Sequence, residues 1–358
     1  MPAFWTEADF DAHEAVEVVH DRASGLTAIF AIHSTHRGPA AGGTRFWHYA
    51  DPALAMRDAL RLSRGMSYKN AMAGLPVGGG KAVILADPAR TKTPALIAAF
   101  GDAIQALGGR YITAEDVGMT VADMVAIAER TKHVSGLPVA GGEAGQNLAG
   151  GDPGPFTAHG IYLGLKAAVA HKLGRDDVSG VHIAVQGTGS VGGTLARLLA
   201  ADGAKLTLAD VDAVRCAALA AELGAQTVVA DAIMDVECDV FSPNALGAIL
   251  DDSGIARLRV PIVAGGANNQ LARGSHGAVL AARGILYAPD YVINAGGIIN
   301  VTLEYLARER GGDGNRAAVD AAIAQIPARL EAIWRTSDAS GESSDAVADR
   351  MAQALIGR

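Results

Sequence analysis

Two lysines are the residues whose setting most clearly suggests chemistry. Lys69 lies in the segment 66–70, and Lys81 directly follows three glycines at 78–80. If both ammonium groups enter one dry cleft, repulsion and desolvation lower their pKa values. One lysine can then hold a substrate carboxylate while the other, closer to neutral, takes part in acid–base catalysis. A single lysine, taken alone, is more often a solvated surface charge.

The glycine run before Lys81 has two interpretations. Gly80-Lys81 suggests a P-loop, but Ala82 stands where that motif needs serine or threonine, and Leu75 occupies its first glycine position. The P-loop is therefore excluded. The pattern instead favours bare backbone that a substrate or cofactor can approach closely, with the Lys81 amine projecting into the cleft.

A carboxylate joins the lysines as a candidate. Asp116 ends the segment 111–116, which has the pattern of a strand. Ligands of open α/β sheets bind at the carboxyl ends of strands, so Asp116 is placed where a site is expected. Glu115 is its local competitor, and spacing alone does not choose between them.

A glycine motif in the second half predicts a dinucleotide site. A buried-strand pattern over 181–186 leads into a GxGxxG segment, and an apolar helix follows directly. The first glycine permits a tight turn, the second lets backbone approach a pyrophosphate, and the third lets helix and strand pack closely. The helix N-terminus supplies free N–H donors. The motif consists of Gly187, Thr188, Gly189, Ser190, Val191 and Gly192.

The residue expected to bind the adenosine ribose is Asp210. It ends the next predicted strand, 18 residues beyond Gly192, close to the usual spacing of about 20. Its carboxylate can accept hydrogen bonds from ribose hydroxyls and repels a 2′-phosphate, which favours NAD over NADP. Arg215 could soften this preference but lies one turn into the next helix. A Rossmann-like domain without nucleotide is the alternative.

The elements that position these residues alternate between strand and helix. Strands over 15–21 and 26–34 flank Ser24-Gly25, and a helix begins at Asp51-Pro52. The other expected strands are 82–87, 111–116, 181–186, 205–210, 238–242, 260–264 and 285–288, and the other expected helices are 93–107, 121–131, 156–173, 190–202, 213–223, 298–310, 316–336 and 344–356. The alternation predicts an α/β fold whose second half is a doubly wound parallel sheet.

Residues 136–155 separate the two series. They contain seven glycines and three prolines, a composition that favours a hinge over a plain surface loop. We expect two domains separated by a cleft: an α/β substrate-binding and catalytic domain over 1–140 and an NAD-binding Rossmann domain over 141–339. A C-terminal helix over 340–358 is expected to pack back. Closure at the hinge would exclude water from the cleft.

Composition excludes several classes of protein. The chain has 358 residues, half of them apolar, and a net charge of −8, so no overall basic field favours nucleic acid. No apolar run of about 18 residues predicts a membrane span. Cys216 and Cys238 lie in apolar segments, which argues against a disulfide scaffold or a cysteine zinc site and indicates a reducing, cytoplasmic location. His33 and His36 would point to opposite faces of a strand end, so a metal pair is not expected.

From about residue 15 to 310 the sequence resembles the amino-acid dehydrogenase family that includes the leucine, valine, phenylalanine and glutamate enzymes. It is most similar to the leucine/valine/phenylalanine branch. The resemblance rests on long motifs in family order, at 38–45, 66–70, 76–81, 113–118, 187–192, 267–270 and 288–297. It implies an N-terminal substrate and oligomerisation domain followed by the Rossmann domain.

The resemblance implies roles for the candidates of the first half. Lys69 would bind the substrate α-carboxylate with help from the backbone at Gly42 and Gly43. Lys81 would activate water and stabilise the carbinolamine, and Asp116 would exchange a proton with the amino group. The implied reaction converts an L-amino acid, water and NAD⁺ into a 2-oxo acid, ammonium and NADH.

The resemblance also implies contacts to the cofactor. Asn268 would orient the substrate or the nicotinamide, and Thr157 would contact the cofactor in the cleft. The turn Asn244-Ala245-Leu246 would lie along the nicotinamide ribose. The family often has cysteine where Asn244 stands.

The family's side-chain pocket maps onto four apolar positions: Ala41, Ala114, Ile298 and Val301. No lysine stands among them to pair with a glutamate side chain. Because Ile298 and Val301 resemble the branched-chain enzymes, we expect a branched-chain amino acid first and phenylalanine second. The resemblance further implies a homo-oligomer, an octamer or a dimer. A catalytically silent NAD-binding regulatory protein and a 2-hydroxy-acid dehydrogenase are the remaining alternatives.

Overall fold

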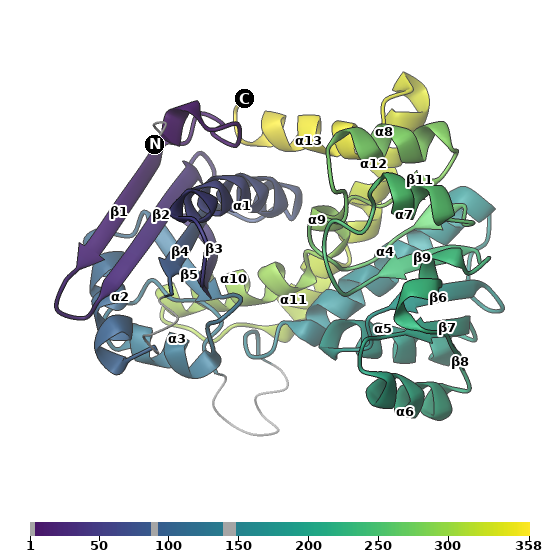
Figure 1. Ribbon diagram of the computed structural model, residues 1–358, viewed down its shortest axis with the longest axis horizontal. Coiled ribbons are helices and arrows are strands. Elements are labelled where there is room, and N and C mark those ends of the chain that lie inside the picture. Colours follow the sequence, from purple (N-terminus) through teal and green to yellow (C-terminus); the bar gives the residue numbers. More distant parts are fainter. Residues whose placement is uncertain (1–3, 87–91, 139–147) are drawn as a thin grey trace. The chain divides into compact units, whose positions relative to one another are not determined.

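The computed structural model describes residues 4–86, 92–138 and 148–358, which form two compact units (Figure 1). The first unit comprises Met1–Asp152, Ile298–Val319 and Ala352–Arg358, and the second Pro153–Gly297 and Asp320–Met351. Residues 298–319 thus pack with the first unit. The division into folding domains at 140/141, with 340–358 packing back, stays a prediction. Most of the expected hinge, 139–147, lies outside the described residues.

The first unit is built on a five-stranded sheet in the order β1-β2-β4-β3-β5. β1 pairs antiparallel with β2 and β2 with β4, whereas β3 pairs in parallel with β4 and β5. The expected hairpin over 15–34 is confirmed as β1 and β2. The strands expected near 82–87 and 111–116 are present as β4 and β5. β3 was not expected, because two glycines interrupt its apolar pattern. The strands are β1 (Ala15–Asp21), β2 (Leu26–Ser34), β3 (Ala40–Trp47), β4 (Gly78–Leu85) and β5 (Tyr111–Glu115).

Helices cover both faces of this sheet. The expected start of α1 (Pro52–Met72) is confirmed: the Asp51 side chain accepts a hydrogen bond from the backbone N–H of Ala53, and a proline opens the first turn. Alternate residues of β2 divide between two cores, since Phe30 packs on the side of α2 (Pro94–Ala106) and Ile29 on the side of α1. Two further helical segments are η1 (Phe4–Thr6) and α3 (Val121–Ala128).

The glycines before Lys81 serve packing inside the protein. A Cβ at Gly79 would overlap the backbone nitrogen of Ser67 on α1, and one at Gly80 would lie 2.9 Å from the Tyr111 ring. The expectation that this stretch stays bare for a ligand is wrong at these two positions. The glycines are needed because α1 and the Tyr111 side chain approach β4 so closely.

Gly79→Ala is therefore expected to destabilise the protein by about 3 kcal/mol or more, since a backbone overlap exceeds ordinary overpacking. Urea unfolding measures the change. Gly65→Ala is the matched control: Gly65 lies in α1 with no atom within 4 Å of its added Cβ. That variant is expected to gain about 0.5–1 kcal/mol of helix stability. Equal midpoints for the two variants would contradict this account.

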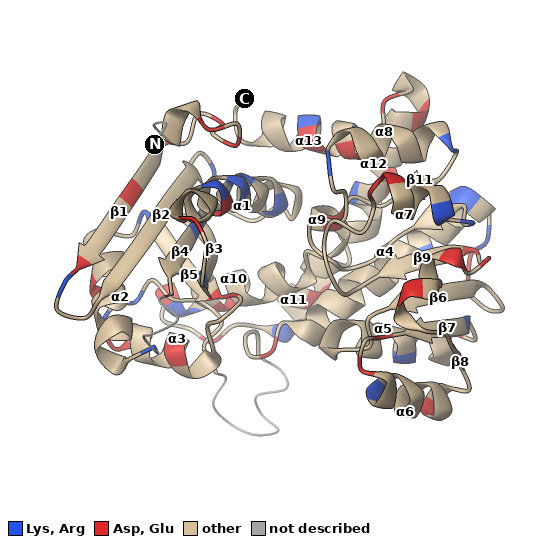
Figure 2. Ribbon diagram, in the orientation of Figure 1, with Lys and Arg blue, Asp and Glu red and all other residues tan. Residues whose placement is uncertain are grey.

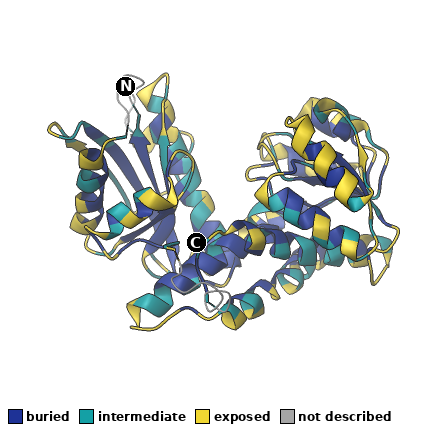
Figure 3. Cartoon of the chain, turned by 90° about the horizontal axis from the view of Figure 1, so that it is seen from below, coloured by how far each residue is buried: buried dark blue, intermediate teal, exposed yellow. Residues whose placement is uncertain are grey.

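The second unit contains a six-stranded parallel sheet in the order β11-β10-β9-β6-β7-β8, which confirms the doubly wound sheet. The inner strands β6, β7, β9 and β10 are mostly buried, whereas both residues of the edge strand β8 are exposed (Figure 3). Phe241 and Tyr287 lie in one core cluster with Leu280. The strands are β6 (His182–Gln186), β7 (Lys205–Ala209), β8 (Gln226–Thr227), β9 (Val240–Pro243), β10 (Ile262–Val263) and β11 (Leu286–Tyr287).

One expected helix is divided in two. The range 316–336 forms α11 (Arg316–Ile323) and α12 (Ile326–Ser340), because Pro327 has no N–H and is favoured in a first helical turn. Within the described ranges, no helix has the length and apolar character needed to cross a bilayer. The remaining helices are α4 (Gly154–Leu173), α5 (Ser190–Ala201), α6 (Ala213–Leu223), η3 (Ala230–Asp235), α7 (Asp252–Arg257), α8 (Ser275–Ala282), α9 (Asp290–Ile293), α10 (Gly296–Glu309) and α13 (Ser344–Leu355).

Candidate active site

Lys81 and Asp116 form an ion pair in the first unit. Lys81 lies in the middle of β4, and Asp116 directly follows the last residue of β5. The Lys81 Nζ donates a hydrogen bond of 2.6 Å to Oδ2 of Asp116. The Lys81 side chain is 7% exposed and that of Asp116 23%. The structure thus joins Asp116 with the lysine, whereas the competitor Glu115 is exposed.

Strand alternation gathers the candidates on one face of the sheet. Parallel pairing sets Arg45 beside Val83 and Gly43 beside Ala114. Because residues two apart share a face, Lys81 and Ala114 lie on the same face as Val83. α1 covers that face, since Val83 packs in a cluster with alanines of α1.

Arg45 connects the Lys81–Asp116 pair to a second carboxylate, that of Asp58. The Arg45 Nε lies 3.3 Å from Oδ2 of Asp116, and its Nη1 lies 2.8 Å from Oδ2 of Asp58. The Tyr49 hydroxyl donates to the same Asp58 oxygen over 2.8 Å. None of these three residues is among the candidates that the sequence indicates. Only Arg45 had a signal, as the last residue of the motif at 38–45.

Burial and neighbouring charges shift the pKa values of both Lys81 and Asp116. Burial lowers the pKa of Lys81, and although Asp116 opposes this effect, the net shift is downward. The positive charge of Arg45 lowers the pKa of Lys81 further. Burial alone would raise the pKa of Asp116, but Lys81 and Arg45 outweigh it and lower that pKa. The result is a buried ion pair whose lysine loses its proton more readily than a lysine in water.

Lys69 lies in the last turn of α1 and is half buried. It is one of the four basic residues of this helix, whose basic positions are blue in Figure 2. The neighbouring Asn70 is fully buried, and its Nδ2 donates to the carbonyls of Ala41 over 3.2 Å and Gly78 over 2.6 Å. These bonds attach the end of α1 to β3 and β4. The last turn of α1 therefore lies over the strand that carries Gly42 and Gly43.

All four expected pocket positions belong to the first unit. Ala41, Ala114 and Val301 are at most 9% exposed, and Ile298 is half buried. A Cβ at Gly136 would lie 3.4 Å from Cγ1 of Val301, so α10 packs beside the segment that follows α3.

The glycine loop of the second unit has the conformation that the motif requires. Gly187 has a φ of +88°, and a Cβ at Gly192 would overlap the Gly187 carbonyl oxygen, so only glycine allows this contact. A Cβ at Gly189 would meet no atom within 4 Å. α5 starts at Ser190 without a side-chain cap, which leaves its first N–H groups for an anion. The loop therefore fits a pyrophosphate.

The Asp210 carboxylate, expected to bind ribose, already accepts four hydrogen bonds from the protein itself. Oδ2 accepts hydrogen bonds from the Thr188 backbone N–H over 2.6 Å and from the Thr188 hydroxyl over 2.9 Å. Oδ1 accepts from the Asp212 backbone N–H over 2.9 Å and from Nη2 of Arg215 over 2.8 Å. The expectation that Arg215 lies too far along α6 is wrong, because its long side chain folds back across the first turn.

Three further predicted positions lie in the second unit. The Asn244 side chain connects the ends of β9 and β10, since Nδ2 donates to Ser242 and Oδ1 accepts from the Gly266 N–H over 2.8 Å. Asn268 is exposed, and its Oδ1 accepts from Asn294 over 3.0 Å. The Thr157 hydroxyl donates to the Pro153 carbonyl over 3.0 Å. Two neighbours of Asn244 in the predicted turn, Ala245 and Leu246, are exposed.

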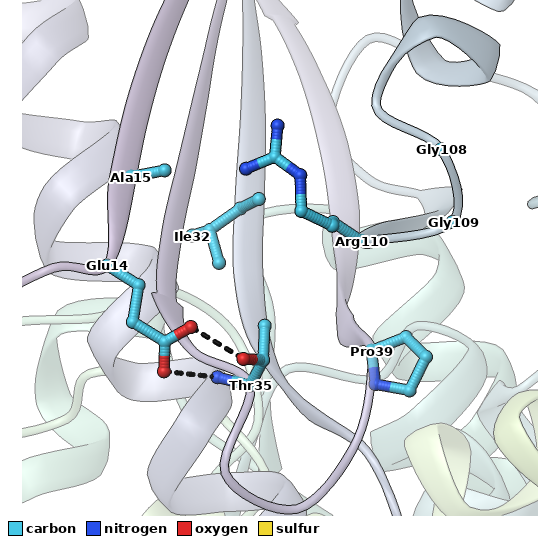
Figure 4. A pocket seen from close by; sticks show the side chains of 8 residues that line it. All are labelled: Glu14, Ala15, Ile32, Thr35, Pro39, Gly108, Gly109 and Arg110. Carbon is cyan, nitrogen blue, oxygen red and sulfur yellow. Dashed lines mark hydrogen bonds between the residues drawn. The ribbon is translucent and has the colours of Figure 1, made fainter.

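A cavity of about 370 Å³ lies elsewhere in the first unit, at the ends of β1 and β2 (Figure 4). Glu14 accepts hydrogen bonds there from the backbone N–H and the hydroxyl of Thr35. None of the residues that line this cavity belongs to the predicted site. In the part of the chain that the structure describes, no three histidine, cysteine, aspartate or glutamate side chains are grouped to hold a metal ion.

Comparison with known proteins agrees with this architecture. Residues 11–133 match the model of the Glu/Leu/Phe/Val dehydrogenase dimerisation domain, and residues 210–355 match that of the glutamate/leucine/phenylalanine/valine dehydrogenases. Leucine dehydrogenase of Thermoactinomyces intermedius is 46% identical over 96% of this chain and 91% of its own. Valine dehydrogenase of Streptomyces albus is 43% identical over 97% and 93%.

A solved structure extends the similarity to the whole fold. The crystal structure of L-tryptophan dehydrogenase from Nostoc punctiforme is similar with a TM-score of 0.83 and 39% identity, over 96% of each chain. The two family models together match more than half of the chain. The two relatives are more than 40% identical to it over nearly its whole length. The chain belongs to the Glu/Leu/Phe/Val family of amino-acid dehydrogenases.

Proposed function

We propose that the protein catalyses the NAD-dependent, reversible oxidative deamination of a branched-chain L-amino acid to the 2-oxo acid and ammonium. The observation that carries this proposal is the buried Lys81–Asp116 pair. A lysine with a lowered pKa and an adjacent carboxylate supply the base and the proton acceptor that deamination needs. The relatives named leucine and valine dehydrogenase support the substrate class.

The protein's residues would divide the reaction as follows. Lys69, with the backbone at Gly42 and Gly43, holds the substrate carboxylate. Asp116 accepts a proton from the substrate ammonium, which frees the nitrogen lone pair. A bound nicotinamide would supply the acceptor for the Cα hydride, and loss of that hydride would leave the substrate as a protonated imine. Lys81 in its neutral form takes a proton from water as that water attacks the carbon of the protonated imine. Asp116 then returns its proton to the carbinolamine nitrogen, the C–N bond breaks to release ammonia, and the hydroxyl loses its proton as the 2-oxo group forms.

The residues of the second unit fit a dinucleotide. The open space at Gly189 and the uncapped start of α5 would hold the pyrophosphate. Asp210 stands at the ribose position and favours NAD. Thr157, Asn268 and the Asn244–Leu246 turn would lie along the nicotinamide half.

The apolar pocket sets the substrate order. Ala41, Ala114, Ile298 and Val301 offer no partner for a charged side chain, so leucine, valine and isoleucine come first and glutamate last. Phenylalanine is the second candidate, because Ala41 is small and leaves room for a larger side chain. One methylene changes discrimination by only about 1–3 kcal/mol.

The proposal is tested by NADH formation with leucine, valine, isoleucine, phenylalanine, tryptophan and glutamate. The highest kcat/KM is expected for a branched-chain substrate. In the reverse direction, NADH oxidation with a 2-oxo acid must require ammonium. Activity without ammonium would indicate a 2-hydroxy-acid dehydrogenase, and no turnover with any pair would indicate a silent NAD-binding protein.

The pH dependence provides a second prediction. The rate of oxidative deamination should rise with pH and reach half its maximum below pH 10.5, the ordinary pKa of lysine. The physical reason is that Lys81 acts as a base only when neutral, and its pKa is lowered, so the neutral form appears at lower pH. A profile of kcat/KM against pH measures this midpoint. A midpoint at or above the ordinary lysine value contradicts the assignment.

We also propose a homo-oligomer, an octamer or a dimer, located in the cytoplasm. The match of residues 11–133 to a dimerisation-domain model supports assembly. Light scattering on the purified protein measures the number of subunits. A monomer would contradict this part of the proposal.

A further inference from the structure

The adenosine end of the predicted cofactor site contains an arginine between two carboxylates. Nη2 of Arg215 lies 2.8 Å from Oδ1 of Asp210, and Nη1 lies 3.1 Å from Oδ2 of Asp212. The Asp212 side chain also caps α6 by accepting a hydrogen bond from the Arg215 backbone N–H. The guanidinium is therefore held directly at the residue that should recognise the ribose.

The acceptor sites of Asp210 are all in use. A carboxylate offers about four lone-pair positions, and Asp210 receives four hydrogen bonds: two from Thr188, one from Asp212 and one from Arg215. Three of these donors belong to a backbone N–H or to a buried hydroxyl. Arg215 is the donor that can move, since its side chain is 48% exposed. A ribose hydroxyl that binds Asp210 must take the place of Arg215.

The same arginine suits a different ligand group. A guanidinium carries five N–H donors, and the bonds to Asp210 and Asp212 use two of them. Its positive charge offsets one of the two carboxylates that it contacts, so the repulsion that would exclude a 2′-phosphate is reduced. In dinucleotide-binding folds, an arginine near the ribose position can accommodate that phosphate.

We propose that Arg215 determines selectivity at the cofactor 2′ position, so that the protein binds NADP as well as NAD. With NAD, Arg215 moves aside and Asp210 accepts the ribose hydroxyls. With NADP, Arg215 stays in place and donates to the 2′-phosphate. This inference rests on the proposed dinucleotide site but not on the amino-acid chemistry.

The test uses nucleotide fragments that need no turnover. Isothermal titration calorimetry on the full-length protein measures the Kd of 2′,5′-ADP and of 5′-ADP. Arg215→Ala is expected to weaken 2′,5′-ADP by about tenfold or more, the size of a charge-assisted hydrogen bond. In the same variant the Kd of 5′-ADP should stay unchanged or fall, because Arg215 no longer competes with the ribose hydroxyls for Asp210. Fluorescence titration with NADPH and NADH repeats the comparison with whole cofactors.

Arg197→Ala is the matched control. Arg197 forms a two-bond ion pair with Glu222, joins α5 to α6, and is 53% exposed. Its removal changes the net charge by the same amount without touching Asp210. Affinity for 2′,5′-ADP should stay within about threefold of the unmodified protein, since an exposed charge at a distance is screened.

Asp212→Asn gives an independent result if Arg215→Ala unfolds. Asparagine caps a helix as well as aspartate, so α6 is kept while one carboxylate that holds Arg215 is neutralised. Binding of 2′,5′-ADP should become tighter by about threefold or more. An equal loss of both fragments in Arg215→Ala, or no response of 2′,5′-ADP to either variant, overturns the proposal. Absence of amino-acid oxidation with intact fragment binding would instead contradict the proposed function alone.

Discussion

Replacing Lys81 with alanine is expected to lower kcat for oxidative deamination by at least about 10²–10⁴-fold, the contribution of a positioned general base. The side chain is buried and its Nζ contacts Asp116 over 2.6 Å, so neither solvent nor a neighbouring lysine can readily take its place. Steady-state kinetics at saturating amino acid and cofactor measure the loss.

Lys81→Arg separates the proton transfer from the charge. Arginine keeps the ion pair with Asp116 but does not deprotonate in proteins, so a similar loss of kcat is expected. Lys132→Ala is the control, since Lys132 is an exposed lysine of the same unit paired with Glu309. It should retain nearly full activity. If Lys81→Arg kept more than about a tenth of kcat, positive charge alone would explain the role of Lys81.

Asp116→Asn is expected to lower kcat by about 10²–10³-fold, because an amide cannot take the proton of the substrate ammonium. It also removes the carboxylate that raises the pKa of Lys81. The pKa of Lys81 should then fall further, and the residual rate should reach half its maximum at a lower pH than in the unmodified protein. A pH profile of the variant measures this shift, which lost packing alone would not produce.

Glu115→Gln is the matched control for the neighbouring acid. Glu115 is exposed at the end of β5, and Lys81 is not among the charges that act on its carboxyl group. Activity within about threefold of the unmodified protein is expected for a surface change. If Glu115→Gln lost the activity and Asp116→Asn kept it, the roles of the two acids would be exchanged.

Local features of the fold could be predicted because they depend on neighbours in the sequence. Asp51 followed by proline predicts the start of α1, and the side chain makes that cap. The Gly187 turn follows from the GxGxxG spacing, and its φ of +88° agrees. Pro327 shows the limit: the apolar pattern continues across it, but the missing N–H ends one helix and starts another.

The candidate site was predicted only in part. The sequence indicates Lys81 and Asp116 but not Arg45 and Asp58, because the roles of the latter two depend on contacts of β3 with α1 and with the end of β5. The run of glycines at 78–80 suggests space for a ligand when only the sequence is considered. Their actual neighbours, Ser67 and Tyr111, come from elements distant in the sequence.

What residue order alone determined is the family, the alternation of elements and the identity of the glycine loop, since each depends on spacing along the chain. Tertiary structure decided which acid faces Lys81 and which donor occupies Asp210. Both answers require distances between side chains 35 and 5 positions apart. The reason is physical: pairing of β4 and β5 with β3 and the fold-back of the Arg215 side chain determine which charges meet.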